Sequence, residues 1–263
     1  MRPGSSLLID LLICLRFATR LPLPILGVES APHALASFSH ALRLLPMAGA
    51  LIGALAAGAL AVASALGLPP ALSAPIAIGF LILLSGALHE DGLADCADGF
   101  GGGATRERKL EIMQDSRIGA FGALALALAL YLRVAGLAII AGWSIGLASA
   151  VIIGAAALSR AAALLPLVLL PPARSGGAGF AAGKPEPAAL RIALSLGCLF
   201  ALAPILAGGG AARALFAIAA VSGAALAFVG LARRQIGGQT GDVAGATQQI
   251  GEIIAYLVFA AGN

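Results

Sequence analysis

The sequence predicts an all-α, polytopic integral membrane bundle of six to seven transmembrane helices. Of its 263 residues, 60% are hydrophobic and 11% are charged, whereas soluble domains average about 25% charged residues. The hydrophobic residues form successive runs close to the roughly 20 residues that a helix needs to cross a bilayer. No long polar linker divides these runs, so residues 1–263 are expected to form a single membrane domain in contact with the lipid bilayer.

The expected crossings follow one another along the chain, and the last is the weakest because Gln248, Gln249 and Glu252 interrupt it. Small residues recur at four-residue spacing in Gly49, Gly53 and Ala57 and in Ala123 and Ala127, a pattern typical of closely packed membrane helices. The expected spans are Leu42–Leu66, Leu72–Leu88, Ile118–Ala141, Ile145–Leu170, Leu190–Ala207, Arg213–Leu231 and Gly245–Ala260.

The N-terminal residues 5–20 are expected to form an amphipathic helix in the membrane interface. Asp10 interrupts the apolar run Leu7–Leu15, and no small-residue cleavage site precedes Arg16, so a signal peptide is not expected. The three cysteines lie far apart and predict no disulfide framework.

The basic residues give the orientation of the predicted bundle. Alternate connections contain Lys and Arg, and those near 67–71 and 142–144 contain none. By the positive-inside rule, the N-terminus and the basic connections face the cytoplasm. Because the basic residues are spread between hydrophobic segments, and aromatic residues are only 5% of the chain, nucleic-acid binding is not expected. A homo-oligomer is left open.

An acidic segment at residues 89–122 lies on the predicted cytoplasmic side, between two apolar spans. It contains seven of the 12 acidic residues: Glu90, Asp91, Asp95, Asp98, Glu107, Glu111 and Asp115. Residues i, i+4 and i+7 share one helix face, so Asp91, Asp95 and Asp98 are expected to project together. Hard oxygen ligands favour Mg²⁺, with Mn²⁺ as the alternative, over Zn²⁺.

The remainder of the acidic segment is expected to fold back on this face. Gly99 and Gly101–Gly103 are expected to break the first helix. A second helix from Thr105 would then carry Glu111 and Asp115 on one face, followed by Arg117. We therefore predict catalytic metal ligands at Asp91, Asp95, Asp98 and Asp115, with Glu90 as a further or alternative ligand.

Two arginines, Arg133 and Arg160, lie well inside predicted spans and away from their ends. Arg160 is nearer the cytoplasmic end, where a charged residue is a candidate for binding phosphate or carboxylate. Arg133 is nearer the opposite end, where its side chain is expected to extend to the membrane surface. We therefore expect Arg160 to bind substrate, and Arg133→Ala to leave activity close to wild type.

The segment Gly237–Gly245 (GGQTGDVAG) combines flexible backbone with polar side chains at the start of the last span. Gln239, Thr240 and Asp242 are expected to contact substrate together with Arg117 and Arg160. Thr240 or Asp242 has the alternative role of capping the final helix.

These blocks resemble the cobalamin synthase family, the adenosylcobinamide-GDP ribazoletransferases. The resemblance rests on E-D-G-L-A-D-x-A-D-G, on R-E-R-K-L-E-I-M-x-D-S-R-I-G-x-F-G and on G-G-Q-T-G-D-V-x-G-A, all in order. Phe17–Pro24 (FATRLPLP) and Pro46–Gly53 (PMAGALIG) extend it to the N-terminal region.

The resemblance implies a Mg²⁺-dependent enzyme of the bacterial inner membrane that acts in the last steps of cobalamin biosynthesis. It implies transfer of cobinamide phosphate from adenosylcobinamide-GDP to α-ribazole or α-ribazole 5′-phosphate, with release of GMP.

Two other functions remain open. Asp95-x-x-Asp98-Gly99 also resembles the start of the CDP-alcohol phosphotransferase motif, although the Arg expected soon after it is absent. A divalent-cation transporter would instead place carboxylates near the midplane, often in both halves of an inverted repeat.

Overall fold

The computed structural model describes residues 7–24, 38–175 and 183–261. Regular structure in these ranges is helical, with one isolated bridge between Pro172 and Gln239. The elements are α1 (Leu7–Ala18), α2 (Phe38–Ala41), η2 (Leu42–Leu44), α3 (Leu45–Ala65), α4 (Pro70–Ser85), α5 (Leu88–Gly102), α6 (Arg106–Ile112), α7 (Ala120–Trp143), α8 (Ile145–Ala162), α9 (Leu164–Leu169), α11 (Pro187–Ala201), α12 (Ala203–Leu206), α13 (Ala211–Ile236) and α14 (Gly241–Ala260).

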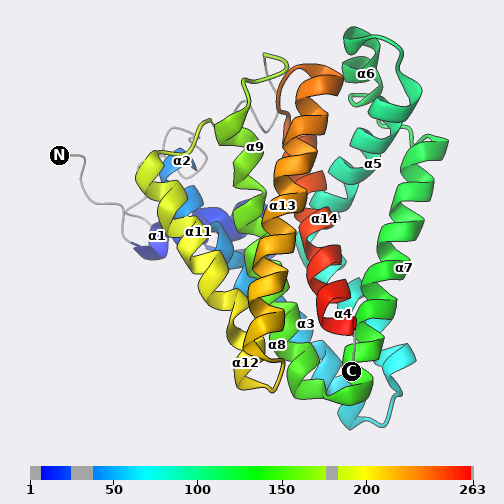
Figure 1. Cartoon of the computed structure of the whole chain (residues 1–263), viewed down its shortest axis with the longest axis vertical. Coiled ribbons are helices and arrows are strands. Elements are labelled where there is room, and N and C mark those ends of the chain that lie inside the picture. Colours follow the sequence, from blue (N-terminus) through cyan, green and yellow to red (C-terminus); the bar gives the residue numbers. More distant parts are fainter. Residues whose placement is uncertain (1–6, 25–37, 176–182, 262–263) are drawn as a thin grey trace.

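Six helical segments of the described chain are long and apolar enough to cross a membrane, which confirms the predicted fold class. They comprise α2 through α3, α7, α8 with α9, α11 with α12, α13 and α14. A seventh crossing is counted only if α4 and α5 are taken as a pair, and these two are bent by 89°. Because α5 carries three aspartates and is not one of the six, we treat it as a polar helix leading toward α6 (Figure 1).

The bend between α4 and α5 is made by two residues in the left-handed region. Gly86 has φ 62° and Ala87 has φ 57°, a conformation that costs a non-glycine residue about 1 kcal/mol or more. The segment after α1 packs onto this bend, since the Arg20 N–H donates to the Leu84 carbonyl at 2.8 Å. A side chain at position 86 would collide with Arg20, so this glycine also makes room for the contact.

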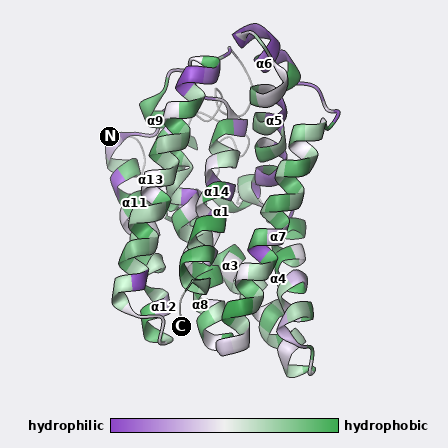
Figure 2. Cartoon of the chain, turned by 45° about the vertical axis from the view of Figure 1, so that its right-hand side comes forward, coloured by the Kyte–Doolittle hydropathy of each residue, from purple (hydrophilic) through white to green (hydrophobic). Residues whose placement is uncertain are grey.

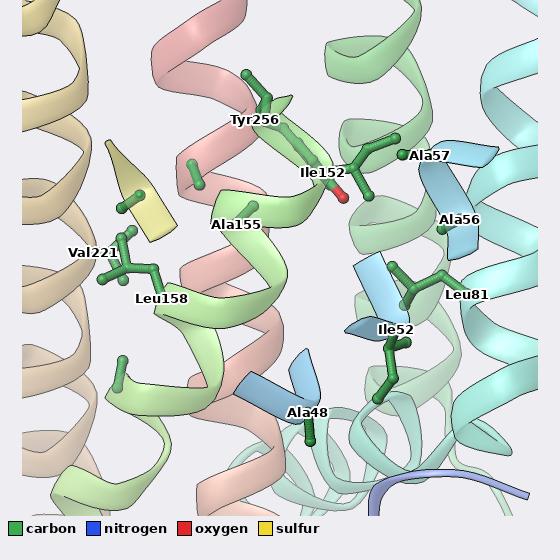
Figure 3. Packing of buried hydrophobic residues seen from close by; sticks show 14 of the residues in the cluster. Ala48, Ile52, Ala56, Ala57, Leu81, Ile152, Ala155, Leu158, Val221 and Tyr256 are labelled. Atoms are coloured by element: carbon green, nitrogen blue, oxygen red, sulfur yellow. The ribbon is translucent and has the colours of Figure 1, made fainter. Parts of the chain in front are cut away.

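Helix α8 is the centre of the bundle, with α3, α11 and α14 packed around it. Apolar residues of α3 and α8, among them Ile52, Ala56, Ile152 and Ala155, meet in the core together with Tyr256 of α14 (Figure 3). The predicted small-residue face of α3 is confirmed at Gly49 and Gly53, which lie against the α8 backbone. The prediction was wrong for Ala123 and Ala127, which are exposed on α7.

Gly53→Ala is expected to lower the stability of the detergent-solubilised protein by about 1–3 kcal/mol. A Cβ at position 53 would lie 2.9 Å from the Ile153 Cα and 3.0 Å from the Ile152 oxygen, so α3 and α8 must separate. Gly58→Ala is the matched control on the same helix, because nothing lies within 4 Å of a Cβ there. Thermal unfolding should show a lower midpoint for Gly53→Ala alone; equal midpoints would contradict the packing.

Helix α1 is present where the sequence predicted one, and its Asp10 is explained by an ion pair. The Asp10 carboxylate is fully buried, and Arg43 Nη2 lies 2.6 Å from its Oδ2. Arg43 belongs to η2, and Cys14 Sγ donates to the Ala41 carbonyl at 3.0 Å, which links α1 to α2 as well. Leu7 and Leu8 face outward. The location of α1 in the membrane interface stays a prediction.

Hydrophilic residues gather at one end of the bundle, around α6 and the adjoining ends of α5 and α13 (Figure 2). The N-terminus of α14 lies at this end as well, because it follows the C-terminus of α13 after a short turn (Figure 1). The fold therefore brings the acidic segment and the Gly237–Gly245 segment together.

Candidate active site

The three aspartates of the acidic face lie on one helix, α5, as the spacing predicted. Asp91 is exposed, Asp95 is half-buried and Asp98 is buried. A Cβ at Gly92 would lie 2.8 Å from the Asp242 carbonyl oxygen, so this glycine allows α14 to approach α5 closely. The acidic face is thereby brought next to Asp242, which is 144 residues further along than Asp98.

Helix α5 ends within the predicted glycine run, at Gly102 with Gly103 as its C-cap, but the prediction was wrong for Gly99 and Gly101, through which the helix continues. These glycines provide space for neighbouring side chains instead. A Cβ at Gly99 would lie 2.4 Å from Met113 Cγ, and one at Gly101 would lie 2.8 Å from the Phe121 ring. The missing side chains let the α6 region and the start of α7 pack directly on α5.

Asp98 holds the N-terminus of α7. Its Oδ2 accepts from the Gly119 N–H at 2.7 Å and its Oδ1 accepts from the Gly122 N–H at 2.8 Å. These N–H groups have no partner within the helix, and a carboxylate there also interacts favourably with the helix dipole. Each oxygen keeps a further lone pair. Asp98 therefore has a structural role that its spacing did not reveal, and its role as a metal ligand stays a prediction.

Asp115 and Arg117 form a local pair in the segment between α6 and α7. Arg117 Nη2 lies 2.6 Å from Asp115 Oδ2, and the Arg117 side chain is 87% exposed. The hydrogen bonds from Arg117 lower the pKa of Asp115 to about 2. Helix α6 ends at Ile112, so the expected helical face shared by Glu111 and Asp115 was wrong. Glu111 instead pairs with Arg108 at 2.7 Å.

The structure does not gather all the predicted metal ligands at one point. In the described parts of the chain, no group of three or more His, Cys, Asp or Glu side chains is arranged to hold a metal ion. Burial of the Asp95 carboxyl, reinforced by the Asp91 and Asp242 charges, raises its pKa to about 7. This burial and repulsion, which Arg174 offsets only in part, fit a site for a hard cation. Mg²⁺ is often bound by one or two carboxylates and completed by substrate phosphates and water.

A cavity of about 110 Å³ opens beside these carboxylates. His89, Asp91 and Asp242 supply its polar wall. The apolar wall comes from α1, the α2–α3 region and the α8–α9 region. Its apolar lining includes Phe17, Phe38, Leu42, Leu45, Leu88, Ala163, Leu164 and Leu167. The cavity thus places a polar side next to an apolar side.

The Gly237–Gly245 segment is fixed by backbone contacts. Thr240 caps α14, with its hydroxyl accepting from the Val243 N–H at 3.3 Å, as the alternative interpretation of the sequence held. The Gln239 N–H donates to the Pro171 carbonyl, and the Ala173 N–H donates to the Gln239 carbonyl, each at 2.8 Å. Within residues 7–24, 38–175 and 183–261, the buried Gln239 Oε1 has no hydrogen-bond partner, so it can accept from a ligand.

Arg174 is a site residue that the sequence interpretation assigned only to topology. Its Nη2 lies 3.2 Å from Asp242 Oδ2, and the Pro172–Gln239 bridge fixes the backbone immediately before it. No spacing pattern links residue 174 to residue 242, so only the tertiary fold reveals this contact.

The prediction that Arg133 extends to the membrane surface was wrong. Its side chain is 1% exposed and lies inside the bundle, 2.7 Å from Glu90 Oε1 and 2.9 Å from Glu252 Oε1. Gln249 also accepts from Arg133, at 3.1 Å. Gln249 and Glu252 are two of the polar residues that interrupt the last predicted span. Their presence there could have indicated a buried partner such as Arg133. Glu90 accordingly faces Arg133, although the sequence placed it among the further metal ligands.

Arg160 lies in the same buried region and is fully buried. Its Nη1 donates to the Ala156 carbonyl at 3.0 Å, while its Nε and Nη2 have no hydrogen-bond partner in the described part of the chain. Arg133 and Arg160 carry two positive charges, and Glu90 and Glu252 carry two negative charges, so this buried cluster is neutral overall. Arg160 is not among the residues that line the 110 Å³ cavity, and its contact with substrate stays a prediction.

Comparison with known proteins gives the family. The family model described as cobalamin-5-phosphate synthase matches residues 10–260. A protein of Azorhizobium caulinodans named adenosylcobinamide-GDP ribazoletransferase is 50% identical over 257 residues, which cover 97% of this chain and 96% of the relative. A Bradyrhizobium diazoefficiens protein of the same name is 44% identical over 266 residues, covering 99% and 98%.

A third relative of that name, from Sinorhizobium sp, is 47% identical over 244 residues, covering 90% of both chains. No solved structure matches this chain. The match to the family model and the identity to these relatives extend over nearly the whole length. The chain therefore belongs to the cobalamin-5-phosphate synthase family of enzymes.

Proposed function

We propose that this protein joins adenosylcobinamide-GDP to α-ribazole, or to α-ribazole 5′-phosphate, and releases GMP. The products are adenosylcobalamin or its 5′-phosphate. The names of its relatives support the two substrates. The structural observation that carries the proposal is the acidic cluster of Asp91, Asp95 and Asp242, of which Asp91 and Asp242 line a cavity with an apolar wall. Cobinamide is a large organic group attached to phosphate, and such a cavity suits the junction between the two.

The proposed reaction is a substitution at phosphorus. The α-ribazole hydroxyl oxygen forms a bond to the phosphorus attached to cobinamide, the bond from that phosphorus to the GMP oxygen breaks, and a carboxylate accepts the hydroxyl proton. Asp91 and Asp95 would hold Mg²⁺, with Asp98 or Asp242 adding an oxygen and Mn²⁺ as a substitute. When bound, Mg²⁺ neutralises charge on the diphosphate and stabilises the leaving oxygen.

The remaining predicted residues would bind and orient the substrates. Gln239 would accept a hydrogen bond from the substrate through its unpartnered Oε1. Thr240 would set the position of Asp242 by capping the first turn of α14. Asp115 and Arg117, which pair with each other on the surface, would reach the site only if this segment moves inward on substrate binding.

The direct test is incubation of the purified protein with adenosylcobinamide-GDP, α-ribazole and Mg²⁺, followed by measurement of GMP. We expect GMP release that depends on both substrates and that EDTA abolishes. Parallel reactions with α-ribazole 5′-phosphate determine the preferred acceptor. Absence of GMP release from folded protein with both acceptors, or CMP release from a CDP-linked lipid, would contradict the proposal.

We also propose that the site faces the cytoplasm of the bacterial inner membrane. The basic residues around α6 and before α11 lie at the polar end of the bundle, and the opposite connections contain few or no basic residues.

Single-cysteine variants test this orientation in a background from which Cys14, Cys96 and Cys198 have been removed. Cysteines at Thr105 and Lys184 are expected to react with a membrane-impermeant maleimide only after the membrane is opened. Cysteines at Leu68 and Ala211 are expected to react in intact spheroplasts; Ala211 represents the connection around Gly209, because Gly209 itself is buried and Ala211 is exposed. Labelling of the Thr105 variant from outside would reverse the orientation.

A further inference from the structure

Arg174 lies directly against the carboxylates of the proposed site. Its Nη2 is 3.2 Å from Asp242 Oδ2, and its charge also acts on Asp95. The neighbouring residue Ala173 is held on both sides, because its N–H donates to Gln239 and its carbonyl accepts from Arg106 Nη2 at 2.6 Å. The guanidinium is therefore presented from a fixed backbone.

The hydrogen-bonding capacity of this guanidinium is only partly used. A guanidinium offers five N–H donors, and the contact with Asp242 lies at the long end of the normal N–H···O range. Arg174 Nη1 is buried and has no hydrogen-bond partner among the residues that the structure describes. A buried donor without a partner is unfavourable, and a ligand with several phosphate oxygens can satisfy both nitrogens at once.

We infer that Arg174 binds the diphosphate of the nucleotide-linked substrate, and that Asp242 pairs with it while no substrate is bound. Binding of a cation by the carboxylates would draw Asp242 away from Arg174 and leave the guanidinium for the phosphates. This inference rests on the proposed function for the identity of the substrate. It assigns the phosphate contact to a residue outside the predicted set.

The two arginines that the sequence assigned to substrate are less suited to this contact in the described structure. Arg117 is 87% exposed and is already bound to both oxygens of Asp115. Arg160 is fully buried, its charge is balanced by the buried glutamates Glu90 and Glu252, and it does not line the cavity. Arg174 does not line the cavity either, but it contacts Asp242, which does.

The test compares Arg174→Gln and Arg174→Lys with Arg234→Gln. Arg234 is exposed in the last turn of α13, so its replacement removes the same charge from the same end of the bundle. For Arg174→Gln we expect the KM for adenosylcobinamide-GDP to rise at least about tenfold, because a charge-assisted phosphate contact is lost. The KM for α-ribazole should change less than about twofold, since the acceptor makes no such contact. Arg174→Lys should be intermediate, and Arg234→Gln should resemble wild type.

A binding measurement separates this inference from the proposed function. GDP with Mg²⁺ is expected to raise the melting midpoint of wild type and of Arg234→Gln, and to have little effect on Arg174→Gln. If wild type releases no GMP but GDP stabilises it through Arg174, the proposed reaction is wrong and the diphosphate site stands. An unchanged KM with undiminished stabilisation by GDP, in whichever Arg174 variant folds, would overturn the inference.

Discussion

Asp95→Asn is expected to reduce transfer more than about a thousandfold while the protein remains folded and inserted, since a bound metal contributes several kcal/mol to such a reaction. Asp95 lies between Asp91 and Asp98 on α5, and the Asp242 charge also acts on it. The amide keeps the size of the side chain and one acceptor oxygen but loses the charge that attracts Mg²⁺. The substitution also removes repulsion among neighbouring carboxylates, so the metal-free variant should be slightly more stable than metal-free wild type.

The measurement is a Mg²⁺ titration of both GMP release and thermal unfolding. Wild type should gain stability with Mg²⁺, and Asp95→Asn should lose most of this gain together with activity. Glu107→Gln is the matched control, because Glu107 is an exposed carboxylate on the neighbouring helix α6. An active Asp95→Asn protein with unchanged Mg²⁺ dependence would show that the acidic face is not the catalytic metal site.

Arg133→Met is expected to destabilise the protein by about 3–5 kcal/mol, because it leaves buried carboxylates without their partner. Glu90 Oε1 and Glu252 Oε1 both lie within 2.9 Å of Arg133 nitrogens, and the three residues come from α5, α14 and α7. Loss of the pairs should also loosen the start of α5, where Asp91 follows Glu90 directly. Activity should therefore fall together with stability, whereas the sequence led us to expect that replacing Arg133 would leave activity close to wild type.

Two further variants identify the cause of this effect. Replacing one pair of charges together, as Arg133→Met with Glu90→Gln, should recover much of the lost stability, since the remaining buried charges of Arg160 and Glu252 then balance each other. Arg191→Met removes an arginine from the exposed side of α11 and should change stability by less than about 0.5 kcal/mol. Equal unfolding midpoints for Arg133→Met and Arg191→Met would show that the buried pairs contribute little.

The sequence was sufficient for those features that depend on neighbours along one helix. The spans could be predicted because about 20 apolar residues in succession have few alternatives to a membrane. The shared face of Asp91, Asp95 and Asp98 followed from helical periodicity alone, and the structure confirms that one helix carries all three. For Thr240 the sequence allowed two interpretations, substrate contact and capping of α14. Capping could be foreseen because a hydroxyl directly before a helix accepts a hydrogen bond from the first turn of that helix.

Features that depend on contacts between distant segments were not predicted. A glycine in a sequence is compatible with the end of a helix and with close packing between helices. For Gly99 and Gly101, only the positions of Met113 and Phe121 show that close packing is the reason. A carboxylate such as Asp98 is a typical metal ligand in a sequence. In the structure Asp98 caps α7, because the N-terminus of that helix lies against it. Arg133 was assigned to the membrane surface because its partners Glu90 and Glu252 lie 43 and 119 residues away.

The sequence by itself determined that this chain is a helical membrane protein with a carboxylate-rich segment between its spans, since hydropathy and periodicity are properties of single helices. Only the tertiary structure decided how the charges are distributed. It placed Asp242 and Arg174 beside the acidic face and paired Glu90 with Arg133 in the interior. The physical reason is that a charge in a low-dielectric interior must find an opposite charge or a hydrogen-bond partner, and the partner available to it depends on how the helices pack.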